Sequence, residues 1–349
     1  MGAAGTIAAS SKAAHTEPNG LGPRKRDRIS KQEELGWCKQ EEDEELTTVP
    51  SNESLQSLAS DFSEPRQTLI FFDWDDTLFP TAVLGAFVEA GVALPADDAR
   101  KPLLRHWRRA LVDYIRSACE LSDKVVILTN SKRPWVHHCV DIFVPELACM
   151  LEGQEGLRVI YADESSDAQD RLHRRRCAKE TLPPAKFSSA LTALERQEES
   201  MAQKRMCMAR EIRTFYSNES DWKNVLSLGD ATYERDALRD LAFRRKGGEV
   251  RAKTLLLPTA PALSEITLRL RFSRLLLPAY VSLDGDLDLD LRAADDPLFT
   301  IADALHMPAI KDIDFPRHAW GRSEVPDERA VILALEKMEG AVQDGILLG

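Results

Sequence analysis

Three carboxylates lie within four residues of one another, directly after a short apolar run. Asp73, Asp75 and Asp76 follow the apolar residues 70–72, and Trp74 lies between the first two. Two carboxylates about 4 Å apart repel each other by roughly 4 kcal/mol at an effective dielectric constant near 20. A hard divalent cation would offset this repulsion, and ligands that are all oxygen atoms indicate Mg²⁺. We expect Trp74 to pack in the core, because side chains alternate along an extended chain.

Two further apolar runs end in polar residues that suit the same chemistry. Thr129 and Asn130 follow one run, and Asp230 and Glu234 follow another. In a parallel sheet, ligands gather beyond the carboxyl ends of the strands, so these side chains should meet in one crevice. A hydroxyl beside free amides at the start of a helix forms an anion site, which we expect at Thr129. The pattern therefore predicts a site for a metal ion and a phosphate group.

The elements that would position these residues alternate between strands and helices. Five apolar runs predict buried strands at residues 67–72, 124–129, 157–162, 224–229 and 252–257. Amphipathic stretches predict helices at residues 103–121, 134–151, 188–216 and 233–243. This alternation predicts an α/β fold, a Rossmann-like three-layer sandwich around a mainly parallel five-stranded sheet. The alternating residues 284–291 predict a further short strand with one charged and one apolar face.

The domain organisation follows from shifts in composition. We expect residues 1–66 to be a disordered tail, because no apolar period survives there. A catalytic domain should span residues 67–258, with a charged insertion at 163–203 and a small or absent cap. Residues 259–349 predict a helical C-terminal extension whose first helix has Thr259 as its N-cap.

Composition limits the partners and the location of the protein. The net charge of −11 argues against binding to nucleic acid. Six scattered cysteines without a CxxC pair fit a reducing compartment, and no apolar run is long enough to span a bilayer. A cytoplasmic location is expected. The pattern at Gly2 and Thr6 suits N-myristoylation and hence weak membrane association, with the basic residues 24–28 as a second attraction or a nuclear-import signal. A solvated tail is the simpler alternative.

Three of these segments resemble the motifs of one enzyme superfamily. Asp73 to Thr77 resemble the DxDxT signature of the haloacid dehalogenase-like (HAD) superfamily, the aspartate-nucleophile phosphohydrolases. Thr129 resembles the second motif and Asp230 with Glu234 the fourth, an acidic pair after a strand. The resemblance covers about residues 68–257, with the motifs in the same order on the expected strands.

The resemblance implies a two-step phosphoryl transfer that depends on Mg²⁺. Asp73 would attack phosphorus and form an aspartyl-phosphate, while Asp75 would act as general acid and then as general base. Thr129 and Asn130 would bind the phosphate. The metal ligands would be the Asp73 carboxylate, the Asp75 backbone carbonyl, Asp230 and Glu234, the last directly or through water. Such a site would take a phosphorylated small molecule or phosphoprotein.

The third motif that the resemblance implies is a lysine that steadies the nucleophile and binds the phosphate. Lys204 lies at the usual distance before Asp230 and is preferred over Lys186 and Lys223, the latter being at the wrong end of its strand. Other roles remain open for some residues: Thr129 could be only an N-cap, and Asp76 a cap or surface residue. An alternative function is a catalytically silent module that binds a phosphorylated partner. The intact pair Asp73 and Asp75 favours the enzyme.

Overall fold

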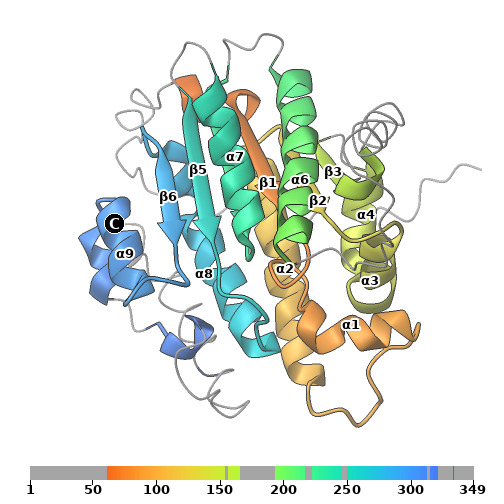
Figure 1. The fold of residues 1–349 in the computed structure, drawn as a ribbon. Coiled ribbons are helices and arrows are strands. Elements are labelled where there is room, and N and C mark those ends of the chain that lie inside the picture. The colour runs from red at the N-terminus through yellow and green to blue at the C-terminus, as the bar shows by residue number, and fades with distance from the viewer. Residues whose placement is uncertain are drawn as a thin grey trace, which may run out of the picture. The chain divides into compact units, whose positions relative to one another are not determined.

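A single parallel sheet forms the centre of the protein. The computed structural model describes residues 61–153, 156–165, 193–216, 222–245, 250–312, 315–320 and 333, all within one compact unit, residues 53–349. The sheet has six strands in the order β3-β2-β1-β4-β5-β6, and every neighbouring pair is parallel (Figure 1). The strands are β1 (Thr68–Phe72), β2 (Lys124–Thr129), β3 (Leu157–Tyr161), β4 (Asn224–Gly229), β5 (Arg251–Leu256) and β6 (Leu287–Asp290). The chain starts at the centre and winds outward in both directions, so the predicted Rossmann-like α/β fold is confirmed.

The predicted strand count of five is wrong, because β6 completes the sheet. β6 pairs with β5 in parallel, with Leu287 and Leu289 buried and Asp288 exposed. The short strand with one apolar and one charged face is therefore present, and it forms an edge of the sheet. Four residues of which two are charged do not resemble a buried central strand, which explains the count.

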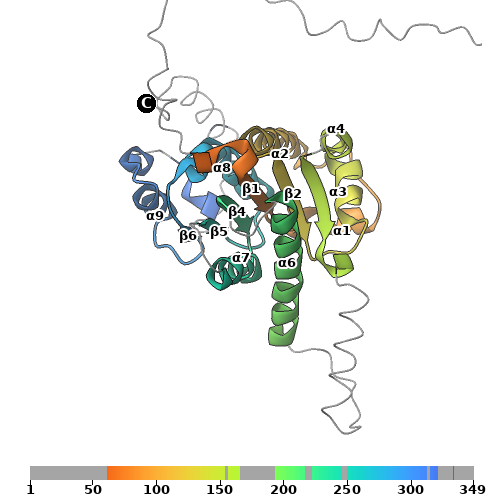
Figure 2. The ribbon, with the colours of Figure 1, turned by 90° about the horizontal axis from the view of Figure 1, so that it is seen from above.

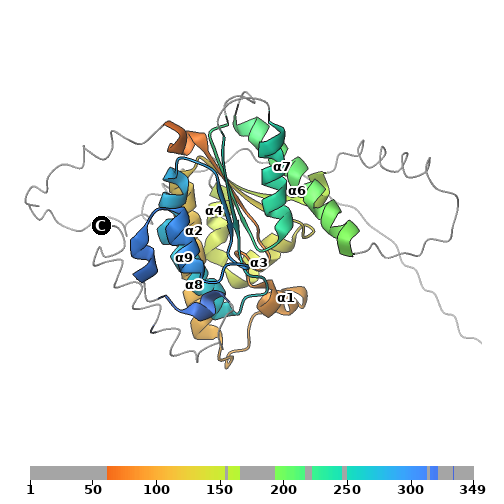
Figure 3. The ribbon, with the colours of Figure 1, turned by 60° about the vertical axis from the view of Figure 1, so that its left-hand side comes forward.

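Both faces of the sheet are buried under helices. In β1, Ile70 and Phe72 join one hydrophobic core while Leu69 and Phe71 join the other. The first core lies under α2 (Lys101–Leu121), α3 (Trp135–Phe143), α4 (Pro145–Gly153), α8 (Leu263–Ser282) and α9 (Pro297–Ala304). The second lies under α6 (Ala193–Phe215) and α7 (Thr232–Arg244), on the opposite side of the sheet (Figure 3). Two-sided burial accounts for the nearly continuous apolar runs in the sequence.

Several element boundaries differ from those expected. The single helix predicted at residues 134–151 is two helices, because Val144 leaves helical geometry with φ −143° and Pro145 begins the next helix. α8 begins at Leu263 with Ala262 as its N-cap, so Thr259 is not the cap. The Ala262 amide instead donates 2.7 Å to the Glu265 carboxylate.

The segment before β1 is folded against the sheet. Residues 61–66, predicted as the end of a disordered tail, form the short 3-10 helix Asp61–Ser63 and the start of a second, Pro65–Gln67. Phe62 is buried, with the Arg251 guanidinium 4.0 Å from its ring centroid. Phe62 therefore packs this segment against β5. Predictions for Gly2, Thr6 and the basic residues 24–28 lie outside the described residues.

The predicted insertion and extension are partly described. α6 begins at Ala193, inside the segment 163–203, and Figure 2 shows one end of this helix extending away from the sheet. The segment 259–349 contains α8, α9 and the 3-10 helices Pro308–Asp312 and Arg317–Trp320, but it also supplies β6. In the part of the chain that the structure describes, no helix is long and apolar enough to cross a membrane. None of the four cysteines in that part forms a disulfide.

Candidate active site

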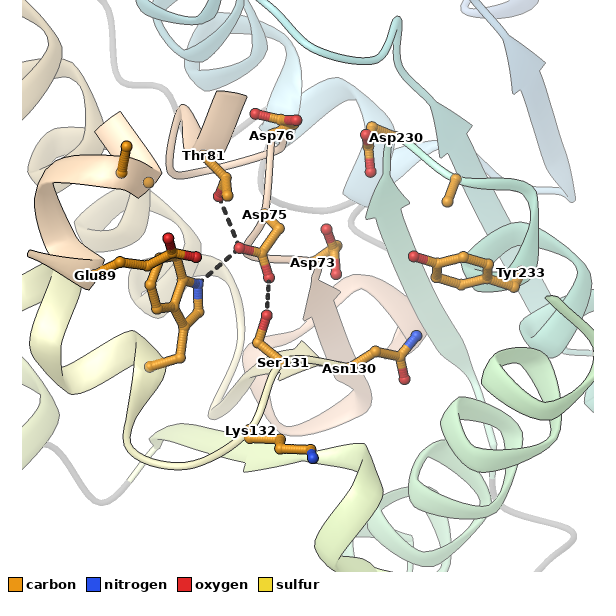
Figure 4. A pocket seen from close by; sticks show the side chains of 14 residues that line it. Asp73, Asp75, Asp76, Thr81, Glu89, Asn130, Ser131, Lys132, Asp230 and Tyr233 are labelled. Atoms are coloured by element: carbon orange, nitrogen blue, oxygen red, sulfur yellow. Dashed lines mark hydrogen bonds between the residues drawn. The ribbon is translucent and has the colours of Figure 1, made fainter. Parts of the chain in front are cut away.

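A polar pocket of about 670 Å³ opens at the carboxyl ends of the central strands (Figure 4). Its walls come from the loop after β1, from α1 (Thr81–Glu89), from the loop after β2 and from the start of α7. The lining residues are Asp73, Asp75, Asp76, Thr81, Gly85, Ala86, Glu89, Asn130, Ser131, Lys132, Trp135, Asp230, Ala231 and Tyr233. The expected convergence of the ends of β1, β2 and β4 is thus present in the structure.

Asp73 lies directly after β1 and is fixed between two neighbouring elements. Its amide donates 2.9 Å to the Leu228 carbonyl of β4, which continues the sheet pairing to the edge of the pocket. Its carboxylate Oδ1 accepts a hydrogen bond of 2.5 Å from Nζ of Lys204 on α6. Asp73 is buried on the side of the lysine and lines the pocket on the other. One carboxylate oxygen is thereby held while the side chain faces the pocket.

Lys204 and Glu234 lie behind Asp73 rather than in the pocket. Lys204 is fully buried, and its Nζ also pairs with Oε1 of Glu234 on α7. Its Nζ also lies 5.1 Å from the ring centroid of Tyr233, a residue that lines the pocket. Glu234 packs against Gly229, where an added Cβ would lie 2.8 Å from the glutamate Cγ. This close approach explains the glycine at the end of β4.

The buried charges shift one another's protonation equilibria. Burial alone would lower the pKa of Lys204, but Asp73 and Glu234 raise it above its ordinary value, so the lysine stays a cation. One cation does not fully compensate two buried carboxylates, and burial raises the pKa of Glu234. Burial also raises the pKa of Asp73, opposed by Lys204 and reinforced by Asp75. Asp73 and Glu234 thus share one buried cation, and the pKa values of both carboxyls are raised.

Asp75 accepts four hydrogen bonds in the pocket. Its Oδ1 accepts from the Thr81 hydroxyl at 2.7 Å and from the Trp135 indole Nε1 at 2.8 Å. Its Oδ2 accepts from the hydroxyls of Ser131 at 2.7 Å and Thr129 at 3.0 Å. Figure 4 shows this carboxylate with its hydrogen bonds from the donors that line the pocket, Thr81 and Ser131 among them.

The two oxygens of Asp75 differ in what they can do with a proton. An indole N–H can only donate, whereas a hydroxyl can rotate to accept. Oδ2 faces two hydroxyls, so a proton placed there keeps its hydrogen bonds if Thr129 or Ser131 rotates. Thr129 also accepts from the Ser131 amide at 2.9 Å, which leaves one of its lone pairs for this purpose. The arrangement suits a carboxyl that gains and loses one proton.

Thr129 and Asn130 occupy different positions in the site. Thr129 is fully buried and its hydroxyl is bonded to Asp75, so it does not line the pocket. Asn130 does line the pocket, and its side-chain oxygen and nitrogen are buried without a hydrogen-bond partner among the described residues. An unpaired buried amide is costly unless a ligand or water satisfies it. Asn130 therefore indicates where a polar ligand binds.

The remaining carboxylates fit a divalent cation. Asp230 and Asp76 line the pocket with Asp73. The pKa of Asp230 is raised to about 7, chiefly by burial and further by the charges of Asp73 and Asp76. Within the described ranges, no group of three or more acidic, histidine or cysteine side chains forms a complete metal site. Mg²⁺ needs only one or two carboxylates, because it keeps several waters. Asp73 and Asp230 would meet this need, whereas Glu234 is engaged with Lys204.

Several residues of the site were not found from the sequence. Thr81 and Trp135 bind Asp75 from α1 and α3, and nothing in their local sequence marks them for this role. Asp76 was expected as a cap or surface residue, and it does accept at 2.9 Å from the Ala82 amide in the first turn of α1. It also lines the pocket, with φ 55°, which was not expected. The spacing from Thr129 to Ser131 carried a usable signal, because hydroxyls two residues apart after a strand commonly form such a turn. Trp74 is fully buried, as predicted.

A second buried cation, Arg269 of α8, stands behind the pocket. Its Nη1 donates 2.7 Å to the Pro258 carbonyl and its Nε donates to the Ala319 carbonyl. Burial lowers the pKa of Arg269 to about 10, while the charges of Glu265, Asp230 and Asp76 oppose that shift. The C-terminal extension thus contributes a charge to the acidic site.

Comparison with known proteins found no relatives. No protein-family model matches the chain, and neither the curated proteins nor the solved structures contain a significant match.

Proposed function

We propose that the protein is a magnesium-dependent phosphatase of the HAD type that acts through an aspartyl-phosphate. The observation that carries the proposal is the position of Asp73, directly after the central strand β1. Its carboxylate pairs with buried Lys204 and faces a pocket that is also lined by Asn130, whose side-chain amide has no hydrogen-bond partner among the described residues. Lys204 opposes the rise in the pKa of Asp73 that burial causes, and it orients the carboxylate as a nucleophile requires. The resemblance of residues 68–257 to HAD motifs supports the same reaction.

The first chemical step forms a bond between a carboxylate oxygen of Asp73 and the phosphorus of a phosphomonoester. The bond from phosphorus to the ester oxygen breaks, and the leaving oxygen takes a proton from Asp75. Rotation of the Ser131 or Thr129 hydroxyl supports the proton on Asp75 beforehand. The Asn130 amide donates to a phosphoryl oxygen.

The second step returns the enzyme to its starting state. Asp75, now ionised, takes a proton from a water molecule, whose oxygen attacks the phosphorus. The bond between phosphorus and Asp73 breaks, and inorganic phosphate leaves. Mg²⁺ bound by Asp73 and Asp230 would neutralise charge on the transferred group.

Hydrolysis of an aryl phosphate by the full-length chain tests the proposal. We expect turnover with Mg²⁺, none after EDTA treatment, and none in Asp73→Asn, which removes the nucleophile at equal volume. Recovery on returning Mg²⁺ controls for damage by the chelator. Turnover that survives Asp73→Asn would disprove the mechanism, whereas phosphate binding without any turnover would favour the silent binding module.

A further inference from the structure

The pocket is lined by more carboxyl groups than a Mg²⁺ site needs. Of the described residues that line it, five bear carboxylates and Lys132 alone bears a cation. Asp73, Asp75 and Asp230 have roles in the proposed catalysis, and Asp76 lines the pocket beside them. A positive charge on the substrate would be attracted by such a lining. The lining therefore favours a substrate that carries a positive charge besides its phosphate.

The fifth carboxylate, Glu89, lies apart from the other four. It is on the last turn of α1, is exposed, and forms no hydrogen bond or ion pair with another described residue. Figure 4 shows its side chain directed along the α1 wall of the pocket. An unpaired carboxylate in the wall of a pocket is a binding group for a cation.

An aromatic surface leads from Asp75 toward Glu89. The Trp135 indole places Nε1 2.8 Å from Asp75, and the far edge of its ring reaches α1, where a Cβ at Gly85 would lie 3.8 Å from Cη2. Glu89 follows Gly85 by four residues on the same face of the helix. Asp75, the Trp135 ring and Glu89 thus form one continuous wall, and Ala86 adds only a small side chain to it.

This wall lies where the leaving group of the proposed reaction would be. The leaving oxygen must be next to Asp75 to receive its proton, so the rest of the alcohol extends along the indole toward Glu89. An aromatic face together with a carboxylate is the combination that binds ammonium groups. We propose that the preferred substrates are phosphate esters of alcohols that carry an ammonium group, held between the Trp135 ring and Glu89. This inference rests on the proposed phosphatase function.

A pair of substrates with equal shape and different charge tests the inference. Phosphocholine and 3,3-dimethylbutyl phosphate differ only in a nitrogen replaced by carbon, which removes the positive charge. With Mg²⁺ and the full-length chain, we expect kcat/KM to favour phosphocholine by about tenfold. In Glu89→Gln the preference should fall to about threefold or less, because the carboxylate is lost.

A matched control variant and an aryl phosphate as a third substrate separate the possible outcomes. Glu120→Gln removes an exposed carboxylate near the end of α2, just before β2 begins and thus at the amino ends of the strands, away from the pocket, and should keep the preference. Equal kcat/KM for the two esters in the wild type, or a preference that survives Glu89→Gln, would overturn the inference. Hydrolysis of an aryl phosphate without either alkyl ester would overturn it and leave the phosphatase standing. Failure to hydrolyse all three would overturn both.

Discussion

The ammonium group of Lys204 lies 2.5 Å from Oδ1 of Asp73, although 131 residues separate the two in the chain. Lys204 also pairs with Glu234, so one buried cation connects the end of β1 with α6 and α7. The proposed nucleophile is thereby held by one layer of helices, α6 and α7, and by the sheet, through its amide bond to Leu228.

Lys204→Met should destabilise the protein strongly. The substitution leaves Asp73 and Glu234 as buried carboxylates without a cation, and loss of one partner of a buried pair costs about 3–5 kcal/mol. Urea unfolding measures the change in the free energy of unfolding. Adding Glu234→Gln to the same variant should restore part of the loss, because it removes one of the unpaired charges. Equal stability of Lys204→Met and wild type would contradict the buried ion pair.

Gly229→Ala should disturb the site through Glu234. The new Cβ would lie 2.8 Å from the glutamate Cγ and 3.1 Å from its Cβ, so the side chain must move from Lys204. We expect a loss of about 1–3 kcal/mol in the free energy of unfolding. Gly153→Ala is the matched control, since a Cβ there meets nothing within 4 Å. A thermal melt that shows equal effects for the two variants would be inconsistent with this contact.

Arg269→Met should have opposite effects on stability and metal binding. It leaves the Pro258 and Ala319 carbonyls without their donor, with an expected cost of about 2–4 kcal/mol in urea unfolding. It also removes a positive charge that acts on Asp76 and Asp230, so Mg²⁺ should bind more tightly by calorimetry. Arg269→Lys keeps the charge and should not tighten binding. Weaker Mg²⁺ binding in Arg269→Met would contradict the electrostatic role.

Lys253 should make the free energy of unfolding depend on pH in the alkaline range. It is fully buried in β5, donates 2.9 Å to the Val281 carbonyl, and has its pKa lowered by burial to about 7. An unfolded lysine keeps a pKa near 10.4, so between pH 7 and 10 the unfolded chain binds more protons than the folded one. Stability contributed through this group therefore rises with pH in that window.

Comparison with Lys253→Met isolates this effect. The free energy of unfolding of wild type relative to the variant should increase by up to about 4 kcal/mol from pH 7 to pH 10. Other titrating groups are common to both proteins and cancel in the difference. A difference that stays constant or falls over this range would show that Lys253 is charged when buried.

The central strands could be predicted because burial on both faces leaves a direct trace in the sequence. β2 (Lys124–Thr129) and β4 (Asn224–Gly229) match the predicted runs residue for residue. β6 was expected as a separate short strand and was not counted in the sheet, because its charged and apolar residues alternate as they do in an edge strand. The division of residues 134–151 into two helices depends on Val144 and Pro145, a local break inside a continuous amphipathic pattern.

The candidate site could be predicted only where its residues follow strands. Asp73, Asp75 and Asp230 each stand after an apolar run, so strand topology alone places them together. Trp135 and Arg269 reach the site from helices through tertiary packing, and no local spacing identifies them. Lys204 was found from a family resemblance, because a lysine in the middle of a charged helix looks exposed until that helix is packed.

Direct detection of a phosphoryl group on Asp73 tests the central claim. The Asp75→Asn variant should accept a phosphoryl group from an aryl phosphate, whose leaving group needs little protonation, and should release it slowly because the general base is gone. Acid quenching followed by peptide mass spectrometry should then find one phosphoryl group on Asp73 and none in the double variant with Asp73→Asn. Turnover by the wild type with no phosphorylated Asp73 in Asp75→Asn, or with the phosphoryl group on another residue, would contradict the account.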